Sequence, residues 1–175
     1  ERIRTFRKWK DGDVEGNVQA EVMGCYFYNI LGEVHTIAQG NDVYQHEFTL
    51  EQSIKHPSLT LFVKDADVRQ EKLAGGMITT LEINATTDDY VRYTANFIAK
   101  EGETDTSTIP SLATEYDFVG RDITVKIADT EAGLTSATAL KLKEMSFTFD
   151  TNAEADFVFG SYSPDDIYNK QFSIE

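Results

Sequence analysis

Histidines are the first side chains in this chain of 175 residues to consider for chemistry. His35, His46 and His56 fall on different predicted elements, and no serine, histidine and aspartate stand at a spacing that nominates a catalytic triad. His46 shares a predicted strand face with Tyr44 and Phe48. This position favours a partly buried histidine with satisfied hydrogen bonds over a ligand or a base. We therefore expect no catalytic residue.

Acidic clusters in the chain invite a calcium-binding interpretation. None of them follows the EF-hand spacing, with its central glycine and terminal glutamate. Each falls where a strand or helix should begin or end, so turn formation explains them better. The clusters are Asp11–Asp13, Asp65–Asp67, Asp88–Asp89 and Asp165–Asp166. Gly75-Gly76 lacks the residues of a phosphate-binding loop, so we expect neither a metal ion nor a cofactor.

The single cysteine, Cys25, falls on the apolar stripe of a predicted helix and is expected to be a small core residue. One cysteine excludes an internal disulfide, which fits a reducing compartment or a particle assembled inside a cell. Trp9 and Phe6 could stack on a sugar or on a partner protein. For Trp9, an anchor between subunits and simple core packing are equally supported.

The formal net charge of −14 limits the partners of the chain. Binding to nucleic acid through phosphates requires dense lysine and arginine, and an anionic membrane surface requires the same. No apolar run is long enough to span a membrane. Solubility alone would explain the charge. A more specific interpretation is that the protein forms a surface that must not bind a polyanion beside it.

Most of the elements that position these residues are predicted strands. Apolar residues alternate with polar ones, which is typical of half-buried strands, at 44–50, 59–63, 77–83, 90–97, 123–127, 140–149, 157–159 and 172–174. A helix is predicted over about 15–31, ending at Gly32, although Gly16 and Gly24 each weaken it by about 1 kcal/mol. Together these elements predict a mainly β fold, a β-sandwich or barrel-like domain with one flanking α-helix.

We expect residues 1–175 to form a single domain with two special segments. Residues 1–14 form an N-terminal arm that opens with basic residues, and residues 101–117 form a long acidic loop without periodicity. The chain begins without methionine and stops within the predicted strand at 172–174. We therefore expect it to be a portion of a longer protein, incomplete at both ends.

Several stretches of the chain resemble the major tail tube proteins of bacteriophages with long, non-contractile tails. The resemblance covers about two thirds of the chain, and its motifs are strand patterns rather than catalytic signatures. The similar stretches are Gly16–Gly32, Glu47–Leu50, Pro57–Lys64, Leu73–Ala85, Tyr90–Lys100 and Leu142–Glu175.

This resemblance implies a structural, non-enzymatic protein that assembles with itself into rings, usually hexameric, which stack into a tube. Such a tube is the conduit for DNA ejection, and double-stranded DNA passes through it without specific binding. The implied partners are the tape measure protein and other tail proteins. The implied location is the virion, with assembly in the host cytoplasm and no insertion into a membrane.

Candidate residues can be named for the lumen of such a tube and for the contacts between its subunits. The polar faces of two paired strands, including Glu47, Glu51 and Glu82, would face the lumen, although the outside of the tube is equally open to them. Because the basic arm and the acidic loop differ in sign, we expect them to join neighbouring subunits. The candidates at these joints are Trp9, Phe6, Glu101, Glu103 and Asp105.

Two alternatives remain at this stage. The chain could be a subunit of another tubular assembly, such as a pilus or a secretion tube. It could also be a β-sandwich module that binds a ligand, which would need an exposed aromatic platform. Trp9 and scattered tyrosines are the aromatic residues that such a platform could use.

Overall fold

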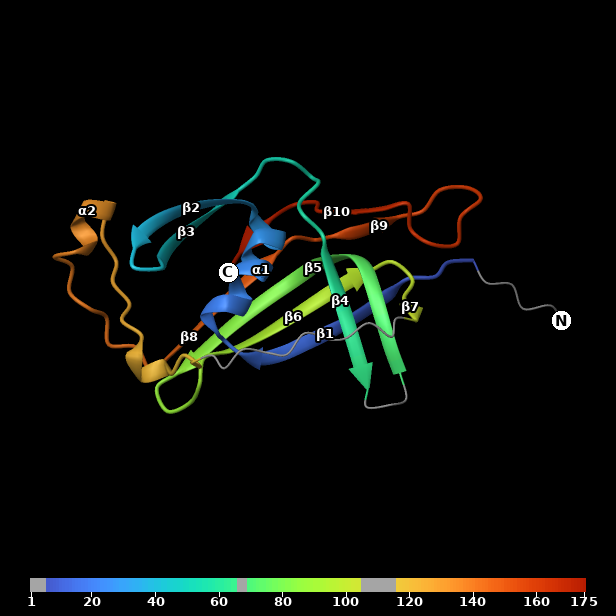
Figure 1. Cartoon of the computed structure of the whole chain (residues 1–175). Coiled ribbons are helices and arrows are strands. Elements are labelled where there is room, and N and C mark those ends of the chain that lie inside the picture. The colour runs from blue at the N-terminus through green and yellow to red at the C-terminus, as the bar shows by residue number, and fades with distance from the viewer. Residues whose placement is uncertain (1–5, 66–68, 105–115) are drawn as a thin grey trace.

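The structure is a computed structural model, and it describes residues 6–65, 69–104 and 116–175. Its centre is a seven-stranded sheet, in which five strands follow the order β1-β6-β5-β8-β11 and β4 and β7 also pair with β5 (Figure 1). All of these pairings are antiparallel. The strands are β1 (Lys10–Asn17), β4 (Leu59–Asp65), β5 (Arg69–Thr86), β6 (Arg92–Ala99), β7 (Glu103–Thr104), β8 (Glu144–Asp150) and β11 (Ser173–Ile174). The fold is therefore mainly β, as predicted.

Two ribbons and a helix lie beside this sheet. Strands β2 (Gly32–Gly40) and β3 (Val43–Leu50) form one ribbon, and β9 (Glu154–Asp156) and β10 (Asp166–Tyr168) form the other. The flanking helix α1 (Ala20–Leu31) lies between β1 and β2 in the chain, and Figure 1 shows it on one side of the β5–β6–β1 strands. Two short helical turns, η1 (Gly120–Asp122) and α2 (Glu131–Leu134), complete the described elements.

The hydrophobic core lies between α1 and the sheet. Met23 and Ile30 of α1 pack against Leu81 of β5 and Tyr93 and Ala95 of β6. These strand residues occupy alternate positions, so one face of the sheet is apolar and is covered by the helix. Aromatic contacts extend this core, because the Phe27 ring meets Phe48 of β3 and Phe149 of β8 at centroid distances of 5.8 Å.

Strand β5 is long enough to join two parts of the sheet. Its first part pairs with β4 and β7, and its second part pairs with β6 and β8. Gly75 lies near the end of the first part with φ of 65°, a left-handed conformation that favours glycine. The strand predicted at 77–83 is therefore part of a longer one, because β5 already begins at Arg69.

The predicted helix is confirmed from residue 20 onward, and its predicted start is wrong. Asp11, Asp13 and Glu15 alternate with glycine and valine in β1, so the predicted turn at Asp11–Asp13 is a strand paired with β6. Cys25 is exposed rather than buried in the core. Helical spacing had placed Cys25 on the apolar stripe, but the side of α1 that the sheet covers carries Met23 and Ile30.

The predicted strands are confirmed at 44–50, 59–63 and 77–83, and over most of 90–97 and 172–174. Residues 123–127 and 157–159 are not strands, and of the predicted 140–149 only the part from Glu144 onward is one. Residues 123–127 alternate as predicted, but no strand of the described chain pairs with them. Their contact with the nearby chain is a hydrogen bond from Leu140 N–H to the Val125 backbone oxygen. Strand β2 was not predicted, because its apolar residues Val34, Ile37 and Ala38 do not alternate regularly with polar ones.

The two special segments differ from their predicted bounds. Residues 10–14 of the predicted arm belong to β1 and are thus part of the main sheet. The predicted loop at 101–117 contains β7 at its start, and its residues 105–115 lie outside the described part of the chain. Neither helix among the described residues combines the length and apolarity needed to cross a membrane.

Candidate functional site: an acidic face of the main sheet

The face of the main sheet that points away from α1 is polar along four neighbouring strands. In-register rows cross β1, β6, β5 and β8 in that order, and residues two apart on a strand share a face. One row is Glu15, Thr94, Glu82 and Thr148; its neighbours are Asp13, Asn96, Thr80 and Asp150, and Asn17, Arg92, Asn84 and Ser146. The residues between these rows, such as Val14, Ala95 and Leu81, belong to the core.

Negative charge dominates this surface, which we call the acidic face. Its carboxylates are Asp11, Asp13, Glu15, Glu82, Glu144 and Asp150. Arg92 is the basic side chain of the three rows, and it already pairs with the Asp89 carboxylate at 3.2 Å. Among the described residues, none of the carboxylates of the acidic face takes part in a salt bridge. The charge of this face is therefore not compensated within the described chain.

The spacing of the carboxylates limits their mutual repulsion. Glu15 and Glu82 stand in one row with Thr94 between them, and Asp13 and Asp150 are separated by Asn96 and Thr80. Like charges directly opposite each other on a sheet are destabilising, so neutral neighbours reduce this cost. The Glu82 carboxylate also accepts a hydrogen bond of 2.7 Å from Asn84 Nδ2. The result is a hydrated surface of carboxylates, hydroxyls and amides.

The acidic face is bordered by two strands that are free to pair further. In the described chain, β1 pairs with β6 alone, so its other edge has no strand beside it. Strand β8 pairs with β5 on one edge and, at Phe149 and Asp150, with β11 on the other. From Glu144 to Phe147, no strand of the described chain pairs with the outer edge of β8. Unpaired edges are templates for pairing with another chain.

Of the nominated lumen residues, the structure places Glu82 on the acidic face and the other two elsewhere. Glu47 lies opposite His35 in the β2–β3 ribbon, and Glu51 follows β3. The assumption that their strands are paired is wrong, because β3 pairs with β2 while β5 pairs with β4, β6, β7 and β8. Sequence reasoning missed Asp13 and Glu15, since these residues were assigned to a turn and a helix. Their alternation with Gly12, Val14 and Gly16 was the available signal.

The nominated joint residues make contacts within their own chain. The Trp9 ring packs edge-on against Phe157 at a centroid distance of 5.9 Å and remains partly exposed, whereas Phe6 is 81% exposed. Glu101 forms a 3.0 Å salt bridge with Lys8, so the basic arm and the acidic loop meet inside one subunit. Glu103 lies opposite Lys72 in the β5–β7 pair, and Asp105 lies outside the described residues.

The histidines do not form a site. His46 is exposed rather than partly buried, but its predicted hydrogen bond exists, since Nδ1 lies 2.9 Å from Thr36 Oγ1. The His56 ring lies against the backbone oxygens of Asn29 and Glu51 at 3.3 and 3.2 Å. Among the described residues, no group of histidine, cysteine and carboxylate side chains could hold a metal ion.

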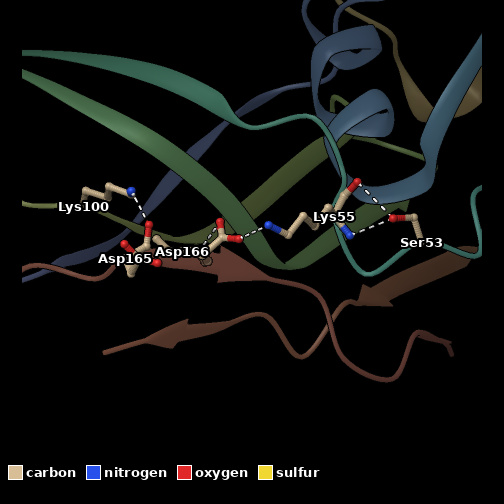
Figure 2. A network of polar contacts seen from close by, with 6 residues as sticks. Ser53, Lys55, Lys100, Asp165 and Asp166 are labelled. Carbon is tan, nitrogen blue, oxygen red and sulfur yellow. Dashed lines mark hydrogen bonds and ion pairs between the residues drawn. The ribbon is translucent and has the colours of Figure 1, made fainter. Parts of the chain in front are cut away.

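The acidic pair Asp165-Asp166 serves to tie loops together (Figure 2). Lys55, in the connection from β3 to β4, reaches the Asp166 carboxylate at 2.6 Å, and Lys100 donates to the Asp165 backbone oxygen at 2.7 Å. The hydrogen bond from Lys55 lowers the pKa of Asp166 and raises that of Lys55. Ser53 Oγ accepts from Lys55 N–H at 3.1 Å, which fixes the same connection. This network attaches the β9–β10 ribbon to the rest of the fold.

Comparison with known protein families identifies the chain. The family model described as phage tail tube protein matches residues 4–175. The chain therefore belongs to the phage tail tube protein family, and it is a structural subunit of a phage tail tube and a component of the virion. As a member of this family it assembles into a tube with other tail proteins. No curated protein matches the chain closely enough to add a second comparison.

Proposed function

We propose that copies of this subunit close into rings, hexameric as is usual for the resembling tail tubes, with the acidic face turned toward the lumen. The stacked rings form the conduit through which double-stranded DNA is ejected. The observation that carries this proposal is the division of the main sheet into a core face under α1 and an opposite face rich in carboxylates. The subunit acts by shape and charge, without catalysis.

The unpaired edges of the sheet support closure into a ring. Strands β1 and β6, β6 and β5, and β5 and β8 are all antiparallel, so β1 and β8 run in opposite directions. If a second copy stands beside the first in the same orientation, its β1 meets β8 of the first in an antiparallel arrangement. This contact joins two different surfaces, and repeated contacts of this kind close into a ring when the rotation allows it.

The charge of the acidic face suits a passage for DNA. Contacts between lysine or arginine and phosphates add affinity that depends on salt, and a wall that holds DNA would slow its ejection. Carboxylates instead repel the phosphates over about 10 Å at 0.1 M salt, the Debye length beyond which salt screens most of the repulsion. In this proposal Glu82 keeps its nominated place in the lumen, whereas Glu47 and Glu51 lie on the outside. The tape measure protein would occupy the same lumen before ejection.

Electron microscopy of the purified subunit at high concentration tests the proposal. We expect open-ended tubes whose reconstruction has β1, β5, β6 and β8 on the inner wall. Discrete monomers would contradict the assembly, and a lumen lined by the β2–β3 ribbon would contradict the orientation. As an independent measurement, a single cysteine at Thr94 in a Cys25→Ser background should become protected from a bulky maleimide reagent on assembly. A cysteine at Gln45 in the same background should stay reactive.

A further inference from the structure

An apolar groove runs between α1 and the β2–β3 ribbon, on the side of the sheet opposite the acidic face. We call it the α1 groove, and its volume is about 1010 Å³. Met23 and Phe27 of α1 and Phe48 of β3 line it, together with the exposed side chains of Val34, Tyr44 and Phe118. Large exposed apolar surfaces of this kind mark sites for a partner.

A second exposed apolar feature lies in the loop that joins β9 to β10. Phe159 is fully exposed there, and Val158 and Tyr162 are largely exposed; we call residues 158–162 the aromatic tip. Its base is held in place, because Trp9 packs on Phe157 and Lys8 N–H donates to the Tyr162 backbone oxygen at 2.7 Å. The tip therefore presents an aromatic side chain on a supported loop.

The two features are complementary in charge. Arg7 lies over the Phe157 ring at 4.7 Å from its centroid, so the aromatic tip has a basic residue at its base. The exposed carboxylate side chain of Asp42 lines the α1 groove. Opposite charges around an apolar contact set its register and exclude wrong partners.

The two features also lie far apart on one subunit. Figure 1 shows the β9–β10 loop at one end of the molecule and the β2–β3 turn at the other, with the strands of the main sheet running between these ends. A tip therefore reaches a groove on another copy. Contacts between different surfaces of identical subunits repeat indefinitely, which is what the length of a tube requires.

We propose that the aromatic tip of one subunit inserts into the α1 groove of a subunit in the next ring, with Phe159 as the buried anchor. This inference rests on the proposed tube. It assigns stacking between rings to the ends of the sheet, while pairing within a ring uses the β1 and β8 edges. Burial of an aromatic side chain in an apolar pocket is the usual form of a dominant interface contact.

Cys25 lines the α1 groove and is exposed, so the chain contains a built-in probe for the proposed contact. A Ser161→Cys variant adds the second thiol to the aromatic tip. Assembled tubes of this variant, treated with a short bismaleimide, should yield a ladder of trimers and longer species on a denaturing gel. A tip in the groove of the next copy gives this ladder, because each subunit is then linked twice.

Two control variants bound this test. Ser161→Cys combined with Cys25→Ser should lose the ladder. Ala132→Cys places a thiol on the exposed turn α2 and retains Cys25. After treatment, tubes of this variant should run as the monomer on the denaturing gel. Dimers alone, or no cross-link in tubes confirmed by microscopy, would overturn the proposed docking and leave the tube proposal standing. Failure of the wild-type chain to form tubes would overturn both.

A second variant tests the anchor itself. Phe159→Asp should reduce the rate of tube growth by about tenfold or more, because an interface anchor would carry a charge into an apolar groove. Ile127→Asp is the matched control, since Ile127 is also a largely exposed apolar residue and lies outside the aromatic tip. Both variants should unfold at the wild-type temperature. Equal tube growth by the two variants would overturn the role of Phe159.

Discussion

Asn29 Oδ1 of α1 accepts a hydrogen bond of 2.8 Å from the backbone N–H of Ile78 in β5, inside the protein. The Asn29 Nδ2 group donates to the backbone oxygens of Pro57 and Gly76 at 2.6 and 3.3 Å. One side chain thus attaches the last turn of the helix to the central strand. This attachment keeps α1 over the core face, on the side of the sheet opposite the acidic face.

Replacing Asn29 with leucine should lower the free energy of unfolding by about 2–4 kcal/mol, because the buried groups left without a partner each cost about 1–3 kcal/mol. Urea unfolding followed by circular dichroism measures this change. Gln45→Leu is the control, since the exposed Gln45 only bonds Gln39 on the ribbon surface. A loss for Asn29→Leu no larger than that of the control would contradict the structural role of Asn29.

Gly120→Ala should destabilise the fold, because a Cβ at this position would overlap the backbone oxygen of Thr86. The expected loss is about 2–3 kcal/mol, in the range of overpacked sites. Gly40→Ala is a useful comparison: nothing lies near its Cβ, but its φ of 87° strains a non-glycine residue. Its cost should be about 1–2 kcal/mol, from the backbone alone. Thermal unfolding would rank the two variants, and the reverse order would contradict the close approach of Gly120 to β5.

Tyr26→Phe should reduce the sensitivity of the fold to alkali. Burial raises the pKa of Tyr26 above its ordinary value of 10.0, and its hydroxyl lies 3.3 Å from the Tyr93 hydroxyl. The neutral phenol is therefore favoured in the folded state. Its contribution is complete below the ordinary tyrosine pKa and is lost as pH rises from there toward the folded pKa.

Unfolding in urea between about pH 8 and pH 11 measures this effect, with a slope of up to about 1.4 kcal/mol per pH unit from one such group. Tyr44→Phe serves as the control, because Tyr44 is exposed on the ribbon. The difference in stability between the wild type and Tyr26→Phe should shrink above about pH 10. A constant difference across this range would show that Tyr26 does not titrate on unfolding.

Reversing the charge of the acidic face should make tubes retain DNA. Glu15→Lys combined with Glu82→Lys would place two cations in one row, on either side of Thr94. Binding of DNA to such tubes should weaken steeply with salt, with a slope of about 0.9 for each phosphate neutralised. Co-sedimentation of short duplexes with tubes over a series of salt concentrations gives this slope. Glu47→Lys with Glu33→Lys on the ribbon is the matched control, and equal DNA retention by both would contradict the lumen assignment.

How far the sequence predicts this structure depends on whether a pattern reflects local or distant contacts. Alternation in 44–50 and 77–83 reflects the pleat of a strand, so these strands were predictable. Helical spacing from Val14 onward mixed a strand with a helix, since the apolar residues of β1 and α1 fill one core. The placement of Glu47 and Glu82 in different sheets depends on pairing between distant strands, which no local pattern contains.

The carboxylates of β1 and β5 also have a consequence for folding. They alternate with core residues along the same strands, so a slip of one residue in pairing would turn them toward the apolar side. Burying an unpaired carboxylate is far more costly than losing a few apolar contacts, so misaligned sheets are strongly disfavoured. Selection for a lumen that does not bind DNA and selection for the correct strand register would then act on the same side chains.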